Sequence, residues 1–287
     1  MAANFFSLQN NEDLHSQNDF FCAEEDNRWS SINYYPSFFG SDSKAPLIIK
    51  SKVFNSISFK DTTFENVNFI NCVFHDCLFI GSVLNNCEVI DCKFYNTNTH
   101  KIKIRGCLIN PKQFDANFDL KYDANIAVDL FQELYRNSKI EEQPKYSNDS
   151  LYKMNVALGY NLNYKYKSRK INLLNFLYEK AKDIINRVTT GYGLKIGRIL
   201  LTVFVTVFFM AILNFNFKDG FTTSNGHEIR SFIDAFYFTC VTVTTLGYGD
   251  ITPSMTITKI IVIVESLVGF VFMSLFVSAF INRVLRS

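Results

Sequence analysis

A five-residue repeat in the first half of the chain restricts the fold more than any other feature. Large apolar residues, most of them phenylalanine, stand at every fifth position from Ile49 to Phe114, with one fault at Thr99. A second column of mostly smaller residues runs two positions before them. A period of five fits neither an α-helix nor an ordinary β-strand. The repeat therefore predicts a solenoid of square coils over residues 46–115, in which each face takes one repeat and large and small residues alternate inward.

Five of the seven cysteines fall in the second column. Their spacing follows the repeat and not a ligand pattern, and serine or threonine takes the equivalent place elsewhere in the column. We therefore expect small buried core residues with reduced thiols, and no metal site. The five are Cys72, Cys77, Cys87, Cys92 and Cys107.

The repeat resembles that of the pentapeptide-repeat family, whose members form a right-handed quadrilateral β-helix with four repeats per coil. The resemblance implies that residues twenty apart stack, which places Cys72 over Cys92 and Cys87 over Cys107. Some members imitate DNA with an acidic surface. Within residues 46–115, however, basic residues slightly outnumber acidic ones, and the whole chain has a formal charge of +2. We exclude DNA mimicry and expect no nucleic-acid partner.

Two long apolar segments near the C-terminus predict membrane-spanning helices over residues 195–216 and 256–283. Lys and Arg concentrate before the first segment and after the second. The positive-inside rule then places both termini in the cytoplasm, and no signal-peptide pattern begins at Met1. We expect a multi-pass protein of the cell inner (plasma) membrane.

A short helix is predicted between the two spans, over residues 232–244. Ser231 and Asp234 form a capping-box pattern at its start. The helix is too short to cross a membrane, so we expect a re-entrant pore helix whose C-terminal dipole favours a cation. It leads into residues 245–250, whose irregular backbone is tolerated at membrane depth only beside protein or a water-filled pathway.

Residues 245–250 and their flanks resemble the selectivity filter of potassium channels, here of a two-span bacterial type. The resemblance implies that backbone carbonyls replace the hydration shell of K⁺, and that Asp250 and Glu265 support the filter. It also implies a homotetramer in the lipid bilayer, because one copy cannot surround an ion, with K⁺ in the filter and no other cofactor. The ion-binding residues are then Thr245, Leu246, Gly247, Tyr248 and Gly249.

The second span carries the candidates for gating. Gly269 lies where the resembled family commonly has a hinge glycine, and close packing against the outer helix is an equal alternative. Apolar residues follow at helical spacing and are candidates for the cavity wall and a hydrophobic gate. They are Met273, Val277, Phe280 and Ile281.

The connector between the repeat and the pore is predicted to be helical. Residues 116–168 fit a helical hairpin broken at Pro144. Residues 169–193 carry a strongly amphipathic stripe that either packs on protein or lies at the membrane surface. We favour the surface, as a slide helix. Gly191-Tyr192-Gly193 then forms a flexible linker and not a second filter, because no acid follows it.

Residues 1–45 combine seven acidic side chains with nine aromatic ones. So many aromatic residues argue against a solvated tail. We expect a folded cap that closes the open end of the solenoid; the alternative is a regulatory arm that binds the cytoplasmic face of the channel.

These features predict a multidomain membrane protein: a tetrameric potassium-selective channel whose all-α pore domain, residues 194–287, is gated through a cytoplasmic pentapeptide-repeat domain. An unidentified cytoplasmic ligand or protein could bind that domain. Two alternatives stay open: a weakly selective cation channel, because Leu246 replaces the commoner valine, and a membrane-anchored interaction scaffold. The four histidines are scattered, so we expect no enzyme. His227 is interpreted as a solvated loop residue, with tuning of conductance by pH as the alternative.

Overall fold

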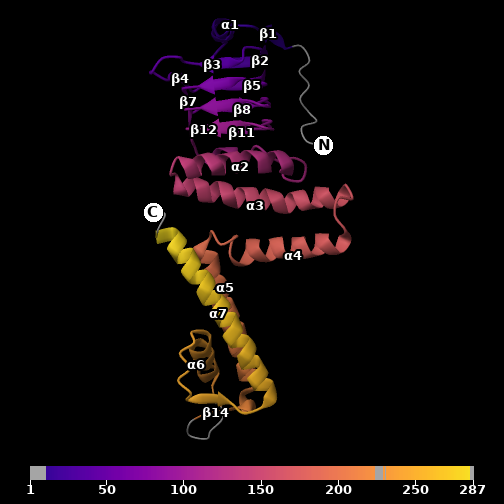
Figure 1. Cartoon of the computed structure of the whole chain (residues 1–287), viewed down its shortest axis with the longest axis vertical. Coiled ribbons are helices and arrows are strands. Elements are labelled where there is room, and N and C mark those ends of the chain that lie inside the picture. Colours follow the sequence, from indigo (N-terminus) through magenta and orange to yellow (C-terminus); the bar gives the residue numbers. More distant parts are fainter. Residues whose placement is uncertain (1–10, 224–228, 230, 285–287) are drawn as a thin grey trace. The chain divides into compact units, whose positions relative to one another are not determined.

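The computed structural model describes residues 11–223, 229 and 231–284 (Figure 1). The chain forms two compact units, Met1–Asp183 and Ile184–Ser287. The first holds a β-solenoid and a helical connector, and the second holds two long apolar helices. The long amphipathic helix α4 runs across the boundary between them.

The repeat folds into the predicted solenoid, with three parallel sheets as three of its sides. The fourth side is narrower and consists of single bridges from Ser58 to Leu78 and from Leu78 to Asn98. Strands of successive coils lie one above the other in Figure 1. The first sheet contains, in spatial order, β1 (Glu12–Leu14), β2 (Arg28–Tyr34), β5 (Val53–Ser58), β8 (Val73–His75) and β11 (Lys93–Tyr95). The second contains β3 (Phe38–Gly40), β6 (Thr63–Glu65), β9 (Val83–Asn85) and β12 (Lys103–Arg105). The third contains β4 (Leu47–Lys50), β7 (Val67–Ile70), β10 (Glu88–Ile90) and β13 (Leu108–Ile109).

Phenylalanine rings stack through the interior at the spacing that the repeat predicts. Phe74 pairs with Phe94 in register, and their ring centroids lie 4.7 Å apart. Phe94 stacks in turn on Phe114 at 4.2 Å. On this side of the solenoid each coil therefore places a phenylalanine over that of the coil before, and aromatic stacking adds to the burial of apolar area.

The cysteines stack as expected from the resemblance. The backbone N–H of Cys72 lies 3.3 Å from the Cys92 sulfur, and Cys87 and Cys107 repeat this contact at 3.3 Å. The thiol of each of the five buried solenoid cysteines also lies close enough to a backbone carbonyl to donate to it. The Cys77 sulfur, for example, lies 3.5 Å from the Phe54 carbonyl oxygen. Burial raises the pKa of the Cys77 thiol to about 12, so it stays protonated at neutral pH.

The solenoid begins earlier in the chain than residue 46, where the uninterrupted repeat begins. Trp29 pairs with Phe54, twenty-five residues away, whereas Ile49 pairs with Phe69, twenty residues away. An additional loop of residues 41–46, between β3 and β4, accounts for the difference. The loop interrupts the period of five, and this is why the first coil was assigned to a separate N-terminal arm.

The N-terminal end of the solenoid is covered by β1 and by α1 (Gln17–Cys22). Phe20 of α1 is fully buried and lies against Trp29, with ring centroids 5.0 Å apart. Two aromatic residues of the predicted cap, Phe5 and Phe6, lie outside the described residues.

Side-chain amides close the open strand edges at both ends of the solenoid. Asn137 accepts from the backbone N–H of Cys107 at 3.0 Å and donates to its carbonyl at 2.7 Å, in the manner of a paired strand. Asn117 does the same for Thr97, and Gln17 does so for Gly40 at the other end. Since an unpaired edge is a template for association, each of these amides covers one residue of an edge that would otherwise be open.

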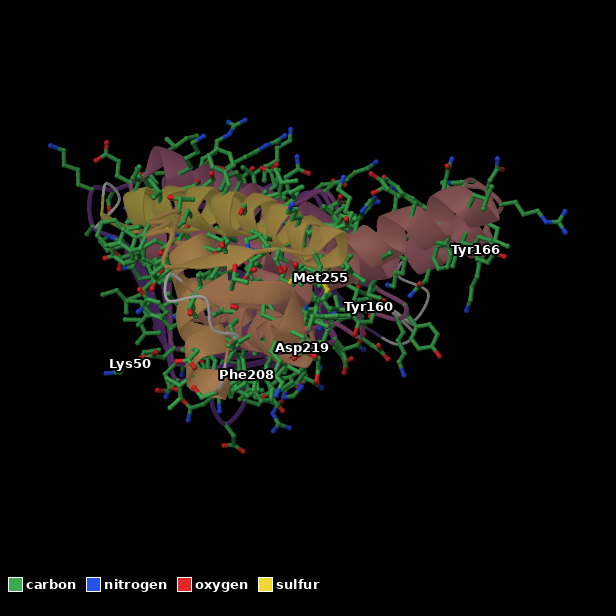
Figure 2. The ribbon with its side chains drawn as sticks, turned by 90° about the horizontal axis from the view of Figure 1, so that it is seen from below. Lys50, Tyr160, Tyr166, Phe208, Asp219 and Met255 are labelled. Atoms are coloured by element: carbon green, nitrogen blue, oxygen red, sulfur yellow. The ribbon has the colours of Figure 1, made fainter. Side chains whose placement is uncertain are left out.

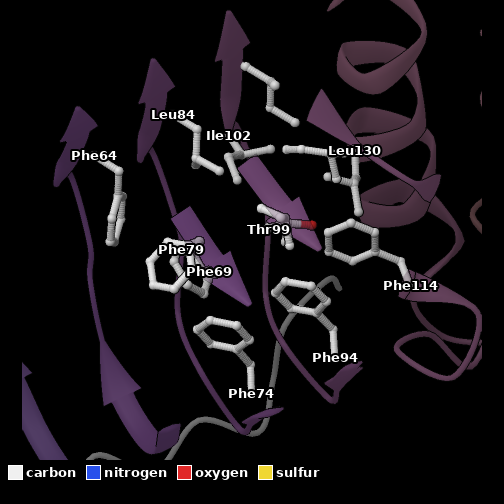
Figure 3. Close-up of a pocket in the computed structure, with 13 residues that line it drawn as sticks. Phe64, Phe69, Phe74, Phe79, Leu84, Phe94, Thr99, Ile102, Phe114 and Leu130 are labelled. Carbon is white, nitrogen blue, oxygen red and sulfur yellow. The ribbon is translucent and has the colours of Figure 1, made fainter. Parts of the chain in front are cut away.

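A small apolar cavity marks the fault in the phenylalanine column (Figure 3). Leu84, Val89 and Thr99 replace phenylalanine around it and leave approximately 20 Å³ unfilled. The hydroxyl of Thr99 is buried and has no hydrogen-bond partner in the described residues. The fault thus leaves both a void and an unsatisfied polar atom in the core.

The connector begins with a single turn, η1 (Pro111–Phe114), and continues as the predicted hairpin of α2 (Ala124–Ile140) and α3 (Pro144–Lys167). Leu130 and Leu134 of α2 are fully buried and belong to the core of the solenoid. His100 pairs with Asp129 of α2 at 3.1 Å, and Asp115 pairs with Lys153 of α3. The hairpin therefore closes the C-terminal end of the solenoid.

Helix α4 (Leu173–Thr189) contacts α3 through polar groups and leaves its apolar stripe exposed. The Lys180 ammonium donates to the Gly159 carbonyl at 2.8 Å and lies 5.6 Å from the centre of the Tyr160 ring. Tyr166 of α3, also labelled in Figure 2, stacks on Phe176 of α4 at 4.6 Å. The apolar stripe consists of Leu174, Leu177, Tyr178, Ile184, Ile185 and Val188, all more than half exposed.

Gly191-Tyr192-Gly193 forms a hydrogen-bonded turn at the end of α4. All three residues have positive φ, of 57°, 59° and 76°. The N–H of Gly193 donates to the Thr190 hydroxyl at 3.1 Å, and the Thr202 hydroxyl donates to the Thr189 carbonyl at 2.8 Å. Glycine permits these dihedrals at little cost, and the hydrogen bonds hold the end of α4 to the start of α5.

The second unit contains two helices that are long and apolar enough to cross a membrane, α5 (Ile196–Asn216) and α7 (Thr256–Val284). Many α5 side chains, such as Phe208, project outward from the helix (Figure 2). Between the two lie η2 (Lys218–Gly220), β14 (Phe221–Thr223), α6 (Phe232–Val243) and β15 (Ile251–Pro253). These bounds lie within a few residues of those predicted for the outer, pore and inner helices.

Candidate functional site

The short helix α6 begins with a complete capping box. The Ser231 hydroxyl accepts from the Asp234 N–H at 3.2 Å, and the Asp234 carboxylate accepts from the Ser231 N–H at 3.0 Å. Each side chain thus satisfies a backbone donor that the first turn of a helix leaves free.

The C-terminal end of α6 is closed by the first residues of the filter sequence. The N–H of Thr245 donates to the Thr242 carbonyl at 3.0 Å, and that of Leu246 donates to the Val241 carbonyl at 3.0 Å. This is a Schellman motif with Thr245 at its left-handed position, where φ is 60°. Glycine usually occupies that position, so the sequence alone gives no indication of the motif.

Residues 245–249 follow as irregular backbone in which the sign of φ alternates. It is positive at Thr245, Gly247 and Gly249 and not at the residues between them. Within a single chain, Leu246 is 61% and Tyr248 67% exposed. One copy of the chain therefore leaves this segment without packing on either side.

The C-terminal end of residues 245–249 is anchored as well, by contacts of the residues that follow it. The Asp250 carboxylate lies close to the Tyr237 hydroxyl of α6. The next strand, β15, pairs antiparallel with β14, and the N–H of Ser254 and the hydroxyl of Thr258 both donate to the Gly220 carbonyl, at 2.8 and 2.9 Å. The filter sequence is thus fixed at both ends by elements of its own chain.

Glu265 of α7 is fully buried in a polar cluster with two other helices. The amide nitrogen of Asn214, at the end of α5, lies 3.1 Å from one Glu265 carboxyl oxygen and 2.8 Å from the Thr239 hydroxyl of α6. Thr239 adjoins Glu265 as well. Glu265 thus meets the short helix at Thr239 and the outer helix at Asn214, and its support of the filter stays a prediction.

Gly269, one turn after Glu265, packs closely against α6. A Cβ at this position would lie 2.6 Å from the Val243 carbonyl oxygen and 2.8 Å from its Cα. The short helix is therefore a close neighbour of Gly269, and the role of this glycine as a hinge stays a prediction. Thr239 and Val243 are also one turn apart on α6. Glu265 and Gly269 of α7 therefore lie beside α6 at two positions that are separated by one helical turn.

The gate candidates do not join this cluster. Met273, Val277, Phe280 and Ile281 lie further along α7 and are each about half exposed in a single chain. Their role as a gate stays a prediction, and His227 lies outside the described residues.

Sequence reasoning missed Asn214, Thr239 and Tyr237 as members of the site. The available signal for Asn214 was its position in an apolar segment, because a polar residue at membrane depth needs a partner. Nothing in the sequence identifies that partner, since Asn214 and Glu265 are fifty-one residues apart.

A short capped helix and an anchored loop lie between two apolar helices that are long enough to cross a membrane. A family model described as "Ion channel" matches residues 198–286. The chain is 30% identical over 165 residues to a hyperpolarization-activated voltage-gated potassium channel of Methanocaldococcus jannaschii, over 54% of this chain and 75% of that protein. This chain belongs to the potassium-channel family.

Plant relatives match a shorter part of the chain. Two-pore potassium channel 4 of Arabidopsis thaliana is 42% identical over 92 residues, which is 32% of this chain and 31% of that protein. Two-pore potassium channel 2 of the same plant is 41% identical over 68 residues, 24% of this chain and 15% of that protein. The chain thus spans less than a third of the length of these relatives.

The solenoid matches a different family model, described as "SV2A/B/C luminal domain", over residues 47–114. No solved structure matches the chain.

Proposed function

We propose that this protein is a potassium-selective channel in which four copies of the chain bring residues 245–249 together around one axis. The alternating sign of φ along these residues carries the proposal. Alternating right- and left-handed residues turn successive N–H groups to one side of the chain, which leaves their carbonyls on the other. Such carbonyls from four chains would supply the oxygen ligands that replace the hydration shell of K⁺.

The exposure of the filter sequence in a single chain supports a tetramer. Leu246 and Tyr248 are largely uncovered, and Gly247 and Gly249 have no neighbouring atom within 4 Å of a built Cβ. Backbone without hydrogen-bond partners is not tolerated in contact with lipid. A four-fold assembly would cover the segment with neighbouring copies on its outer side and with ions and water on its inner side.

We assign α4 to the membrane surface and the solenoid, as a pentapeptide-repeat domain, to the cytoplasm. The exposed stripe of α4 is continuous in sequence with the apolar helix α5, and its polar side already contacts α3. The solenoid can then influence the pore through α4 and the ordered turn at residues 191–193. Spin labels test this placement: a label at Ile185 should be accessible to lipid-soluble oxygen, and one at Lys182 to water-soluble reagents. Equal access to water at both positions would reject it.

Cation flux into liposomes tests the proposed function. Purified protein should admit K⁺ in preference to Na⁺, and Gly247→Ser should abolish that flux, because a side chain at a positive-φ residue of the filter displaces its carbonyls. Equal flux of the two ions would support a weakly selective cation channel. Absence of flux, together with specific retention of one soluble protein by the solenoid, would support the interaction scaffold instead.

A further inference from the structure

The cluster of Asn214, Thr239 and Glu265 contains a residue of the outer helix, which contributes nothing to the filter sequence. We propose that the three side chains form a polar lock through which the outer helix positions the short helix, and hence the filter that follows it. Asn214 is then a positioning residue for ion selectivity. This inference rests on the proposed function and extends it to α5.

The geometry of the lock joins three helices at one point. The Asn214 amide donates to the Thr239 hydroxyl at 2.8 Å and to the two Glu265 oxygens at 3.1 and 3.4 Å. Thr239 adjoins Glu265, which completes the triangle. All three residues are fully buried within a single chain, so neither water nor a neighbouring copy can substitute for a missing partner.

The lock lies one turn from the point where α6 ends. Thr239 is four residues before Val243, the last residue of α6, and Glu265 is four residues before Gly269, which contacts Val243. Thr245, which closes the helix and begins the filter, follows two residues later. A shift of α6 at Thr239 would therefore be transmitted to the filter within one helical turn.

The lock is not optimised for stability, and this favours a positioning role. The carbonyl oxygen of Asn214 is buried and has no hydrogen-bond partner in the described residues. Replacing all members of a buried polar cluster together by apolar side chains of similar volume is often neutral or stabilising, whereas removing one member leaves its partners unsatisfied. If the lock served only to hold the helices together, apolar side chains at all three positions would perform the same task.

An isosteric exchange tests the lock. Asn214→Asp places two carboxyl groups face to face, and Glu265→Gln places two carboxamides face to face. The double variant restores one of each with almost unchanged shape. In wild-type and variant channels reconstituted in bilayers, each single change should lower the K⁺/Na⁺ permeability ratio about tenfold, and the double variant should recover most of the loss. Ser266→Ala is the matched control, because the Ser266 hydroxyl bonds only to the Val262 carbonyl of its own helix, at 2.9 Å.

The triple variant Asn214→Leu, Thr239→Val, Glu265→Met replaces every member of the lock at once and separates positioning from general stability. This variant should melt at or above the wild-type temperature and yet lose K⁺/Na⁺ selectivity. Wild-type selectivity in the triple variant, or equal losses that simply add in the double variant, would overturn the lock.

Different experimental results would contradict the proposed function and the lock. A wild-type protein that does not conduct K⁺ selectively contradicts the proposed function alone. In that case the thermal melting of the same four proteins (wild type, two single variants and the double variant) still decides the lock, since additive changes in melting temperature would contradict contact between Asn214 and Glu265.

Discussion

At the scale of single residues, the contact between Gly269 and Val243 is the tightest constraint on the short helix. The glycine has an ordinary helical φ, so its importance lies in the space that a side chain would need. The backbone of Val243 occupies that space, and backbone atoms cannot rotate away as a side chain can.

Gly269→Ala should therefore displace the end of α6 and disturb the filter. We expect reduced K⁺ conduction or a reduced K⁺/Na⁺ permeability ratio in bilayers, because a Cβ 2.6 Å from a carbonyl oxygen must move one of the two helices. Gly197→Ala is the matched control: a Cβ at this glycine of α5 meets no atom within 4 Å. Wild-type conduction in Gly269→Ala would contradict this account of the packing.

Thr99 offers the opposite test, in which a substitution stabilises the protein. Thr99→Val keeps the side-chain shape and removes a buried hydroxyl that has no partner in the described residues. We expect the free energy of unfolding of the solenoid to rise by about 1 kcal/mol. Trp29, the only tryptophan of the chain, is buried in the solenoid and reports its unfolding by fluorescence. A lower midpoint of denaturation for Thr99→Val would show that the hydroxyl has a partner.

At the scale of elements, the ends of the solenoid are as specific as its coils. A parallel stack of coils has open edges that invite another copy to add on. Here carboxamides from α2, from the loop before it and from α1 satisfy those edges. The same amides therefore stabilise the last coils and limit association.

Asn137→Ala should destabilise the last coil and expose its edge. It leaves the N–H and the carbonyl of Cys107 with fewer partners, and an unsatisfied buried group costs about 1–3 kcal/mol. We expect earlier loss of the Trp29 signal on heating and greater self-association by light scattering. Asn125→Ala, the same change elsewhere on α2, controls for the loss of an amide, and equal effects of the two would reject the capping role.

The elements themselves could largely be predicted from the sequence, because their periods are local. The column of phenylalanines defined the coils, and hydropathy defined α5 and α7. The first coil could not be predicted, because the loop at residues 41–46 interrupts the period of five. The lock could not be predicted either, because hydrogen bonds among Asn214, Thr239 and Glu265 depend on how three helices pack, which no local sequence pattern indicates.

At the scale of the whole molecule, two units of different physical character are joined by one amphipathic helix. The solenoid is held by stacked rings and amide caps, and the second unit by apolar helices around one polar cluster. Helix α4 lies between them in sequence, contacts α3 and ends in a hydrogen-bonded turn beside α5. Our proposal that the solenoid influences the pore assigns that influence to α4 and this turn.

The reversal potential of single channels tests the central claim most directly. With K⁺ on one side of a planar bilayer and Na⁺ on the other, purified protein should show a reversal potential close to that of a K⁺-selective pore. Gly247→Ser should collapse this potential or silence the channel. A reversal potential near zero for the wild-type protein would contradict the claim that residues 245–249 select K⁺.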